Sequence, residues 1–178
     1  PSHAVTNAGT FAVQVDGAAL TSLQLRHYGA SSFDPARIRP ICDCGRFSNK
    51  PSGGLWTSPI DSTWGWKDWC EAESFCVGPL DQWFDHVFTG RVLVIDGESD
   101  LDQLHWKKWS EEIDLYRPVF EPLVPHYDAI HLTIKGQRET RYSFSHCFYG
   151  WDCESVLVMN AACLKPSISV STSALSQH

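Results

Sequence analysis

The run Leu23-Gln24-Leu25-Arg26-His27-Tyr28 alternates apolar and polar side chains, and it is the clearest structural signal in the chain. Strict alternation is typical of a β-strand with one buried face, because successive side chains of a strand point to opposite sides. The pattern predicts that His27 lies on the face of the two leucines, while Arg26 and Tyr28 share the opposite face. An early half-buried strand favours a fold built on a sheet.

Short segments of similar character follow this strand at irregular intervals. Helices are predicted at 64–75 and from Ser99 or Asp100 to Trp109, and Gly136-Gln137 is predicted to be a turn. Because strands and helices do not alternate regularly, a doubly wound parallel sheet is disfavoured, and we expect a mixed α+β fold with short helices. The further strands are predicted at 11–15, 54–58, 91–96, 129–134, 142–148 and 154–159.

Length and composition fit one ordinary globular domain. The chain has 178 residues, of which 43% are hydrophobic and 20% charged, so it can bury a sufficient core without stabilisation by disulfides or metal ions. The segment 166–178 is rich in serine and is predicted to be a flexible tail. We therefore expect one domain over 1–165, followed by this tail.

The charge balance argues against several partners. The formal net charge is −7, and no basic run is longer than Lys107-Lys108. Tight, sequence-independent binding of nucleic acid needs clustered cations, so a nucleic-acid partner is not expected. No apolar run approaches the roughly 20 residues of a membrane-spanning helix, so no membrane partner is expected.

Seven cysteines are present, and no signal peptide is recognised ahead of them. This combination predicts a cytoplasmic protein with reduced thiols. Their spacing matches no zinc ribbon or finger, so no metal is expected and small buried side chains are the main interpretation. A zinc site built from Cys42, Cys44 and a distant histidine remains open as an alternative.

Three separated segments carry residues of chemical interest. They are Leu25-Arg26-His27-Tyr28-Gly29, then Gly53-Gly54-Leu55-Trp56-Thr57-Ser58 followed by Gly65-Trp66-Lys67-Asp68-Trp69, and finally Trp151-Asp152-Cys153-Glu154. In this order they resemble ADP-ribosyltransferases of the diphtheria-toxin-like, His-Tyr-Glu kind. The likeness extends over 23–160. It departs from the family at Trp56, where tyrosine is usual, and at Asp152, where glutamate or glutamine is usual.

The resemblance implies a split β-sheet core of the ADP-ribosyltransferase type and NAD as co-substrate. It implies transfer of a single ADP-ribose to a protein side chain, with release of nicotinamide. A small enzyme of this kind could act as a phage or bacterial effector, in which case its location would be the host cytoplasm.

The chemistry points to a carboxylate independently of the resemblance. Breaking the nicotinamide–ribose bond produces an oxocarbenium-like transition state, which a fixed carboxylate stabilises. Glu154 is the predicted catalytic residue, with a solvated strand edge as its alternative role. Asp152, expected on the same face, would orient the acceptor or act as its base; the alternative is a turn-forming aspartate.

The first segment supplies predicted cofactor contacts. The resemblance implies that His27 hydrogen-bonds the adenosine ribose or the pyrophosphate as a neutral donor. Tyr28 and Arg26 are further candidate contacts. Ordinary strand packing or exposure is the alternative for all three.

The second segment supplies the predicted nicotinamide contacts. Trp56 would stack on the nicotinamide ring, with core packing as its alternative. Thr57 and Ser58 could hydrogen-bond the nicotinamide amide or brace Glu154. Ser58 is preferred, because alternation places it on the face of Trp56.

Two other functions stay open at this stage. One is a non-catalytic protein-binding domain of the same fold, which the departures at Trp56 and Asp152 favour. The other keeps NAD but transfers its ADP-ribose to water, as an NAD glycohydrolase does. Removal of an RNA phosphate is disfavoured because the chain lacks a basic patch.

Overall fold

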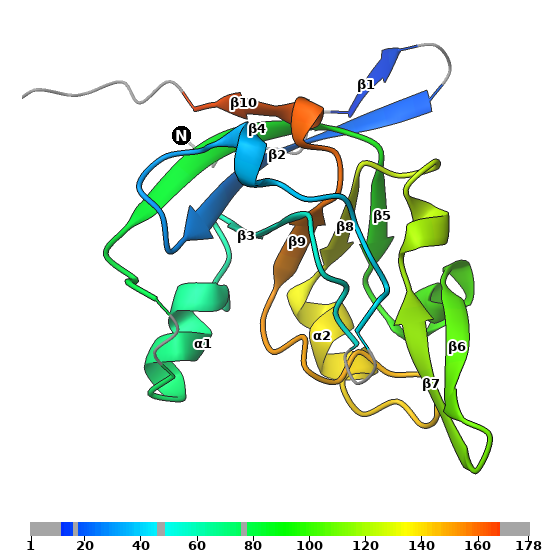
Figure 1. Cartoon of the computed structure of the whole chain (residues 1–178). Coiled ribbons are helices and arrows are strands. Elements are labelled where there is room, and N and C mark those ends of the chain that lie inside the picture. The colour runs from blue at the N-terminus through cyan, green and yellow to red at the C-terminus, as the bar shows by residue number, and fades with distance from the viewer. Residues whose placement is uncertain (1–11, 16–17, 46–48, 76–77, 168–178) are drawn as a thin grey trace, which may run out of the picture.

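The computed structural model describes residues 12–15, 18–45, 49–75 and 78–167, shown in Figure 1. Most of the predicted tail at 166–178 lies outside the described residues. Within the described part, no helix is long and apolar enough to cross a membrane.

An eight-stranded sheet forms the centre of the protein, in the order β10-β4-β2-β3-β9-β8-β5, with β1 paired to β2 outside this path. All pairings are antiparallel except the one between β5 and β8. The strands are β1 (Ala12–Val15), β2 (Ala18–Tyr28), β3 (Leu55–Pro59), β4 (Trp83–Gly90), β5 (Val92–Ile95), β8 (Ala129–Leu132), β9 (Ser155–Val158) and β10 (Leu164–Pro166).

The other elements are short and lie around this sheet. β6 (His105–Ser110) and β7 (Ile113–Val119) form a separate antiparallel hairpin. The α-helices are α1 (Trp66–Ala72) and α2 (Ile134–Thr140). The 3-10 turns are η1 (Pro35–Arg37), η2 (Glu98–Gln103), η3 (Glu121–Leu123) and η4 (Ala161–Cys163). The structure thus confirms an α+β class with a mixed, mostly antiparallel sheet and few short helices.

The sheet consists of two halves joined by a short seam. Strands β2 and β3 pair only at Leu25–Pro59 and Arg26–Ser58, whereas β2 and β4 pair along Thr21–Tyr28. Figure 1 shows β2 and β4 running across the ends of β9, β8 and β5 rather than alongside them. The seam places β2, β3 and β9 next to one another at the centre of the molecule.

Two hydrophobic clusters hold this arrangement. One lies between the sheet halves and includes Leu25 and Phe88 from the first half and Val156 and Val158 from the second. The other packs β5, β8 and β9 against η2, η3 and the segment before β9, with Trp151 only 1% exposed. Burial of these side chains is the main favourable term in folding.

The predicted alternation along β2 is confirmed. Arg26 lies directly opposite Ser58, and Trp56 lies opposite Leu157, so these side chains share one face of the sheet. His27, one residue further along β2, projects to the other face, which Leu25 occupies. The strands predicted at 11–15, 54–58, 91–96, 129–134 and 154–159 also exist, within two residues of their predicted bounds.

Several local predictions were wrong. The helix expected up to Trp109 is only the turn η2, and the chain then enters β6, because His105–Ser110 pairs with β7. Gly136-Gln137 lies inside α2 rather than in a turn. Thr133 caps that helix by accepting a hydrogen bond from the Gly136 amide at 2.9 Å, and any side chain at Gly136 would collide with the Ile95 carbonyl. No strand forms at 142–148, and β4 was not predicted.

The thiols also differ from the prediction. Cys42 and Cys44 form a disulfide rather than staying reduced, which also removes them as zinc ligands in this state. Among the described residues, Cys147, Cys153 and Cys163 are free thiols. Cys70 and Cys153 are buried, as small apolar side chains are expected to be.

Candidate functional site

A cavity of about 350 Å³ opens at the seam, on the face of the sheet that carries Trp56. Its volume lies within the range of about 300–1,000 Å³ that small-molecule sites occupy. The wall comes from β2, β3, the start of α1 and the start of β9, and its lining residues are Arg26, His27, Tyr28, Lys50, Trp56, Thr57, Ser58, Trp66, Asp152, Cys153 and Ser155. Seven of the eight candidate residues named from sequence therefore border one cavity; Glu154 does not.

Aromatic rings give the cavity two flat surfaces. Trp56 packs edge-on against Trp151, with ring centroids 4.7 Å apart. Trp66, at the first position of α1, stacks on Trp69 at 5.3 Å. Because both indoles are supported from behind and are only partly buried, their remaining surface is available for a flat ligand ring.

Two cationic side chains lie at the edge of the cavity. Arg26 makes a two-pronged ion pair with Asp85, at 2.7 and 2.8 Å, and this contact holds the pKa of the guanidinium above its usual value. The Lys50 ammonium lies 5.5 Å from the centre of the Trp56 ring. A ligand in the cavity would meet the Arg26–Asp85 ion pair at one of these points and the Lys50 ammonium at the other.

Ser58 connects the three elements that build the cavity. Its hydroxyl donates to the Glu154 carbonyl at 3.1 Å and accepts from the Trp66 amide at 3.0 Å. A Cβ at Gly65 would lie 3.1 Å from the Ser58 Cβ, so this close approach favours glycine. Ser58 thus braces the main chain of Glu154, one of its two predicted roles, and fixes Trp66 over the cavity.

Thr57 and His27 are committed to internal hydrogen bonds. The Thr57 hydroxyl is buried and donates to the Val156 carbonyl at 2.8 Å. His27 Nδ1 lies 2.7 Å from the Trp56 carbonyl, and since a carbonyl only accepts, Nδ1 carries the proton. Burial lowers the pKa of His27 despite this hydrogen bond. The neutral ring therefore offers Nε2 as an acceptor for a ligand hydroxyl, not as the predicted donor.

Asp152 is the acidic residue among those that line the cavity. One of its oxygens pairs with Arg141 Nη1 at 2.7 Å, and its carbonyl accepts from the Trp64 indole at 3.2 Å. The side chain is 16% exposed, so it is fixed and still reachable. Arg141 lies directly after α2, and it also contacts the rings of Tyr142 and Tyr149.

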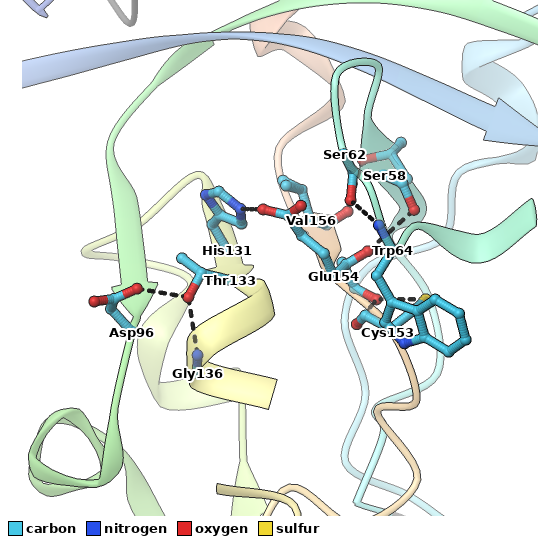
Figure 2. A network of polar contacts seen from close by, with 12 residues as sticks. Ser58, Ser62, Trp64, Asp96, His131, Thr133, Gly136, Cys153, Glu154 and Val156 are labelled. Atoms are coloured by element: carbon cyan, nitrogen blue, oxygen red, sulfur yellow. Dashed lines mark hydrogen bonds and ion pairs between the residues drawn. The ribbon is translucent and has the colours of Figure 1, made fainter. Parts of the chain in front are cut away.

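The Glu154 carboxylate lies on the other side of the sheet, as Figure 2 shows. Its Oε1 is 2.8 Å from His131 Nε2, and the side chain is 12% exposed. Burial alone would raise the pKa of Glu154, but hydrogen bonds from His131 and Ser62 outweigh it and leave the pKa below its usual value. Glu154 is therefore ionised at neutral pH.

The prediction that Asp152 and Glu154 share a face was wrong. Alternation holds only in an extended strand, and the chain bends at Cys153 before β9 begins at Ser155. The bend sends the Asp152 carboxylate toward the cavity and that of Glu154 toward His131.

His27 and Glu154 lie two strands apart in the sheet. His27 is on β2 and Glu154 directly precedes β9, with β3 between these strands. The predicted residues converge on one region but are divided between the two faces of the sheet.

Sequence reasoning missed Lys50 and Arg141 as neighbours of the site. Lys50 lies in a loop and Arg141 follows a helix that was predicted to be a turn, so no sequence pattern linked either to the cavity. Among the described residues, no group of three or more histidine, cysteine, aspartate or glutamate side chains could hold a metal ion.

No protein-family model, curated protein or solved structure matches this chain.

Proposed function

We propose that this protein binds NAD in the cavity beside Trp56 and transfers its ADP-ribose to a protein side chain, releasing nicotinamide. The observation that carries the proposal is the convergence of two indole rings, two cations and one carboxylate on a single cavity. The narrow seam between two sheet halves also agrees with the split sheet that the sequence resemblance implies.

Each part of NAD has a matching group. The nicotinamide ring fits between Trp56 and Trp66, where flat aromatic surfaces favour a planar ligand. The pyrophosphate is complemented by Arg26 and Lys50. A ribose hydroxyl can donate to Nε2 of His27, whose other ring nitrogen donates to the Trp56 carbonyl.

The bond cleavage needs a carboxylate, and we assign that contact to Asp152. As the bond from ribose C1 to nicotinamide breaks, its electron pair leaves with the nicotinamide nitrogen and the ribose becomes cationic. A carboxylate fixed beside C1 stabilises that charge. The acceptor nucleophile then bonds to C1 and gives up its proton to the Asp152 carboxylate. Glu154, the residue predicted from sequence, fixes the chain next to Asp152 through its bond to Ser58.

A protein acceptor has an apolar surface to approach. Tyr142 is 75% exposed and Tyr149 is 59% exposed, and both rings contact Arg141, the partner of Asp152. Exposed aromatic rings are favoured in protein interfaces. An acceptor on this surface would lie next to the cavity carboxylate.

The proposal is tested by incubating the protein with NAD labelled in its adenosine half and with a cell lysate. The expected result is nicotinamide release together with label on a discrete protein band. Asp152→Asn should lose both signals, whereas Asp81→Asn, an exposed carboxylate outside the cavity, should keep both. Absence of nicotinamide release and of any thermal shift with NAD would contradict the proposal.

One observation favours a second candidate, a binding domain without turnover. Asp152 is already neutralised by Arg141, and the hydroxyls of Thr57 and Ser58 are used internally. A non-catalytic protein would give a thermal shift with NAD and no nicotinamide. Release of nicotinamide without any labelled acceptor would instead indicate hydrolysis.

A further inference from the structure

A second hollow, of about 390 Å³, lies away from the cavity, between η2, the start of β6 and the segment after α2. Two kinds of side chain define it, carboxylates and aromatic rings. Its lining residues are Glu98, Leu101, Asp102, Leu104, Trp106, Ser143, Phe144, Ser145 and His146.

The carboxylates of this hollow have no cation of their own. Glu98 and Asp102 are exposed, and within the described part of the chain neither takes part in a hydrogen bond or ion pair. Among the lining residues there is no lysine or arginine to pair with these carboxylates. Two nearby cations of α2 and its end pair elsewhere, Lys135 with Asp96 and Arg141 with Asp152. The lining of the hollow is therefore negatively charged.

The rings of the hollow are of two kinds, one fixed and one free. Trp106 is held by a hydrogen bond from its indole nitrogen to the Leu101 carbonyl at 3.1 Å and by an edge contact with His146 at 4.9 Å. Phe144 at the rim is 100% exposed. An indole fixed beside two carboxylates is the arrangement that attracts an organic cation to an aromatic face.

We propose that this hollow binds the charged head of an arginine or lysine side chain from a basic protein partner. The carboxylates of Glu98 and Asp102 attract the cation, Trp106 lies against it, and Phe144 closes over the apolar stem of the side chain. The net charge of −7 draws a basic partner to the protein as a whole, and these residues give it a defined point of attachment. This site is separate from the cavity, and its occupation does not require NAD.

The test is titration of the protein with a tetra-arginine peptide, followed by calorimetry in the absence of NAD. Glu98→Gln combined with Asp102→Asn should weaken binding by about tenfold or more, and Phe144→Ala by a few-fold. The matched control is Glu111→Gln combined with Glu112→Gln, which removes the same charge at the turn between β6 and β7 and should leave binding unchanged. A tetra-citrulline peptide, which keeps the shape and loses the charge, should not bind.

Three results would overturn the proposal. They are no binding of tetra-arginine to the unaltered protein, an equal loss in the control pair, and equal binding of the citrulline peptide. The first shows that the site is absent, the second that only diffuse charge acts, and the third that the surface does not select cations. Because no NAD is present, these outcomes are independent of the result on nicotinamide release.

Discussion

A cavity opens on one face of the β2–β3–β9 centre and is bordered by Trp56, Trp66 and Asp152. On the opposite face, the Glu154 carboxylate pairs with His131 of β8. Both faces hold a carboxylate of low exposure with a basic partner. They differ in access, because Asp152 lines the cavity beside Trp56 and Glu154 does not. A buried, ionised carboxylate is not by itself a catalytic one: the space beside it decides what it can touch.

The largest expected effect separates the two carboxylates directly. Asp152→Asn should lower nicotinamide release by about 100-fold or more, since removing one group that stabilises transition-state charge costs about this much. Glu154→Gln should lower it by no more than a few-fold. The measurement is steady-state release of nicotinamide by both variants at saturating NAD. The reverse ranking would assign catalysis to Glu154 and would require its carboxylate to leave His131.

A second prediction concerns the rings of the cavity. Trp66→Leu should raise KM for NAD about tenfold and leave kcat nearly unchanged, because stacking on a planar ring contributes on this scale to binding. Trp69→Leu should raise KM less, since Trp69 supports Trp66 from behind and does not itself line the cavity. Equal effects of the two substitutions would mean that the helix, not the ring surface, matters.

The third prediction uses pH to examine the opposite face. The pKa of Glu154 in the folded protein lies below its ordinary value of 4.5, so ionised Glu154 stabilises the fold above that pH. This contribution is lost as the pH falls through the lowered pKa. Glu154→Gln should therefore reduce the free energy of unfolding by about 1–3 kcal/mol at pH 7.

Chemical denaturation across the pH range measures this difference. The gap between the unaltered protein and Glu154→Gln should be full above pH 4.5 and should shrink at lower pH. A gap that does not change with pH would show that the charge of Glu154 does not act through His131.

The smallest effects come from the two hydroxyls of β3. Thr57→Val should cost about 1 kcal/mol of stability, the usual contribution of one hydrogen bond, and leave KM unchanged. Ser58→Ala should cost a similar amount and also raise KM, because Ser58 fixes Trp66 over the cavity. Thermal unfolding and NAD kinetics of the two variants measure these effects on stability and KM. Equal KM values for the two variants would contradict the assigned role of Ser58.

The sequence predicted the strands of the centre and the alternation of Arg26, His27 and Tyr28, because both are local consequences of strand geometry. It placed Trp56 and Ser58 on one face for the same reason. It could not predict the side on which Asp152 lies, since that depends on a bend at Cys153 that no pattern signals. Nor could it place Arg141 beside the cavity, because that contact joins segments through the tertiary fold.

Local sequence patterns were also a limited guide to where helices form. The segment Ile134–Thr140 contains a Gly-Gln pair typical of a turn, but Thr133 caps it and Gly136 allows close contact with Ile95, so a helix forms. Conversely, the apolar spacing that predicts a helix up to Trp109 is overridden by pairing between β6 and β7. In both cases, tertiary contacts outweigh local preference.

The most direct test of the account is a structure of the protein with NAD bound. We expect the nicotinamide ring to lie between Trp56 and Trp66, with ribose C1 within about 3.5 Å of a carboxylate oxygen of Asp152. Density for NAD on the opposite face, with C1 beside Glu154 and the cavity empty, would contradict it.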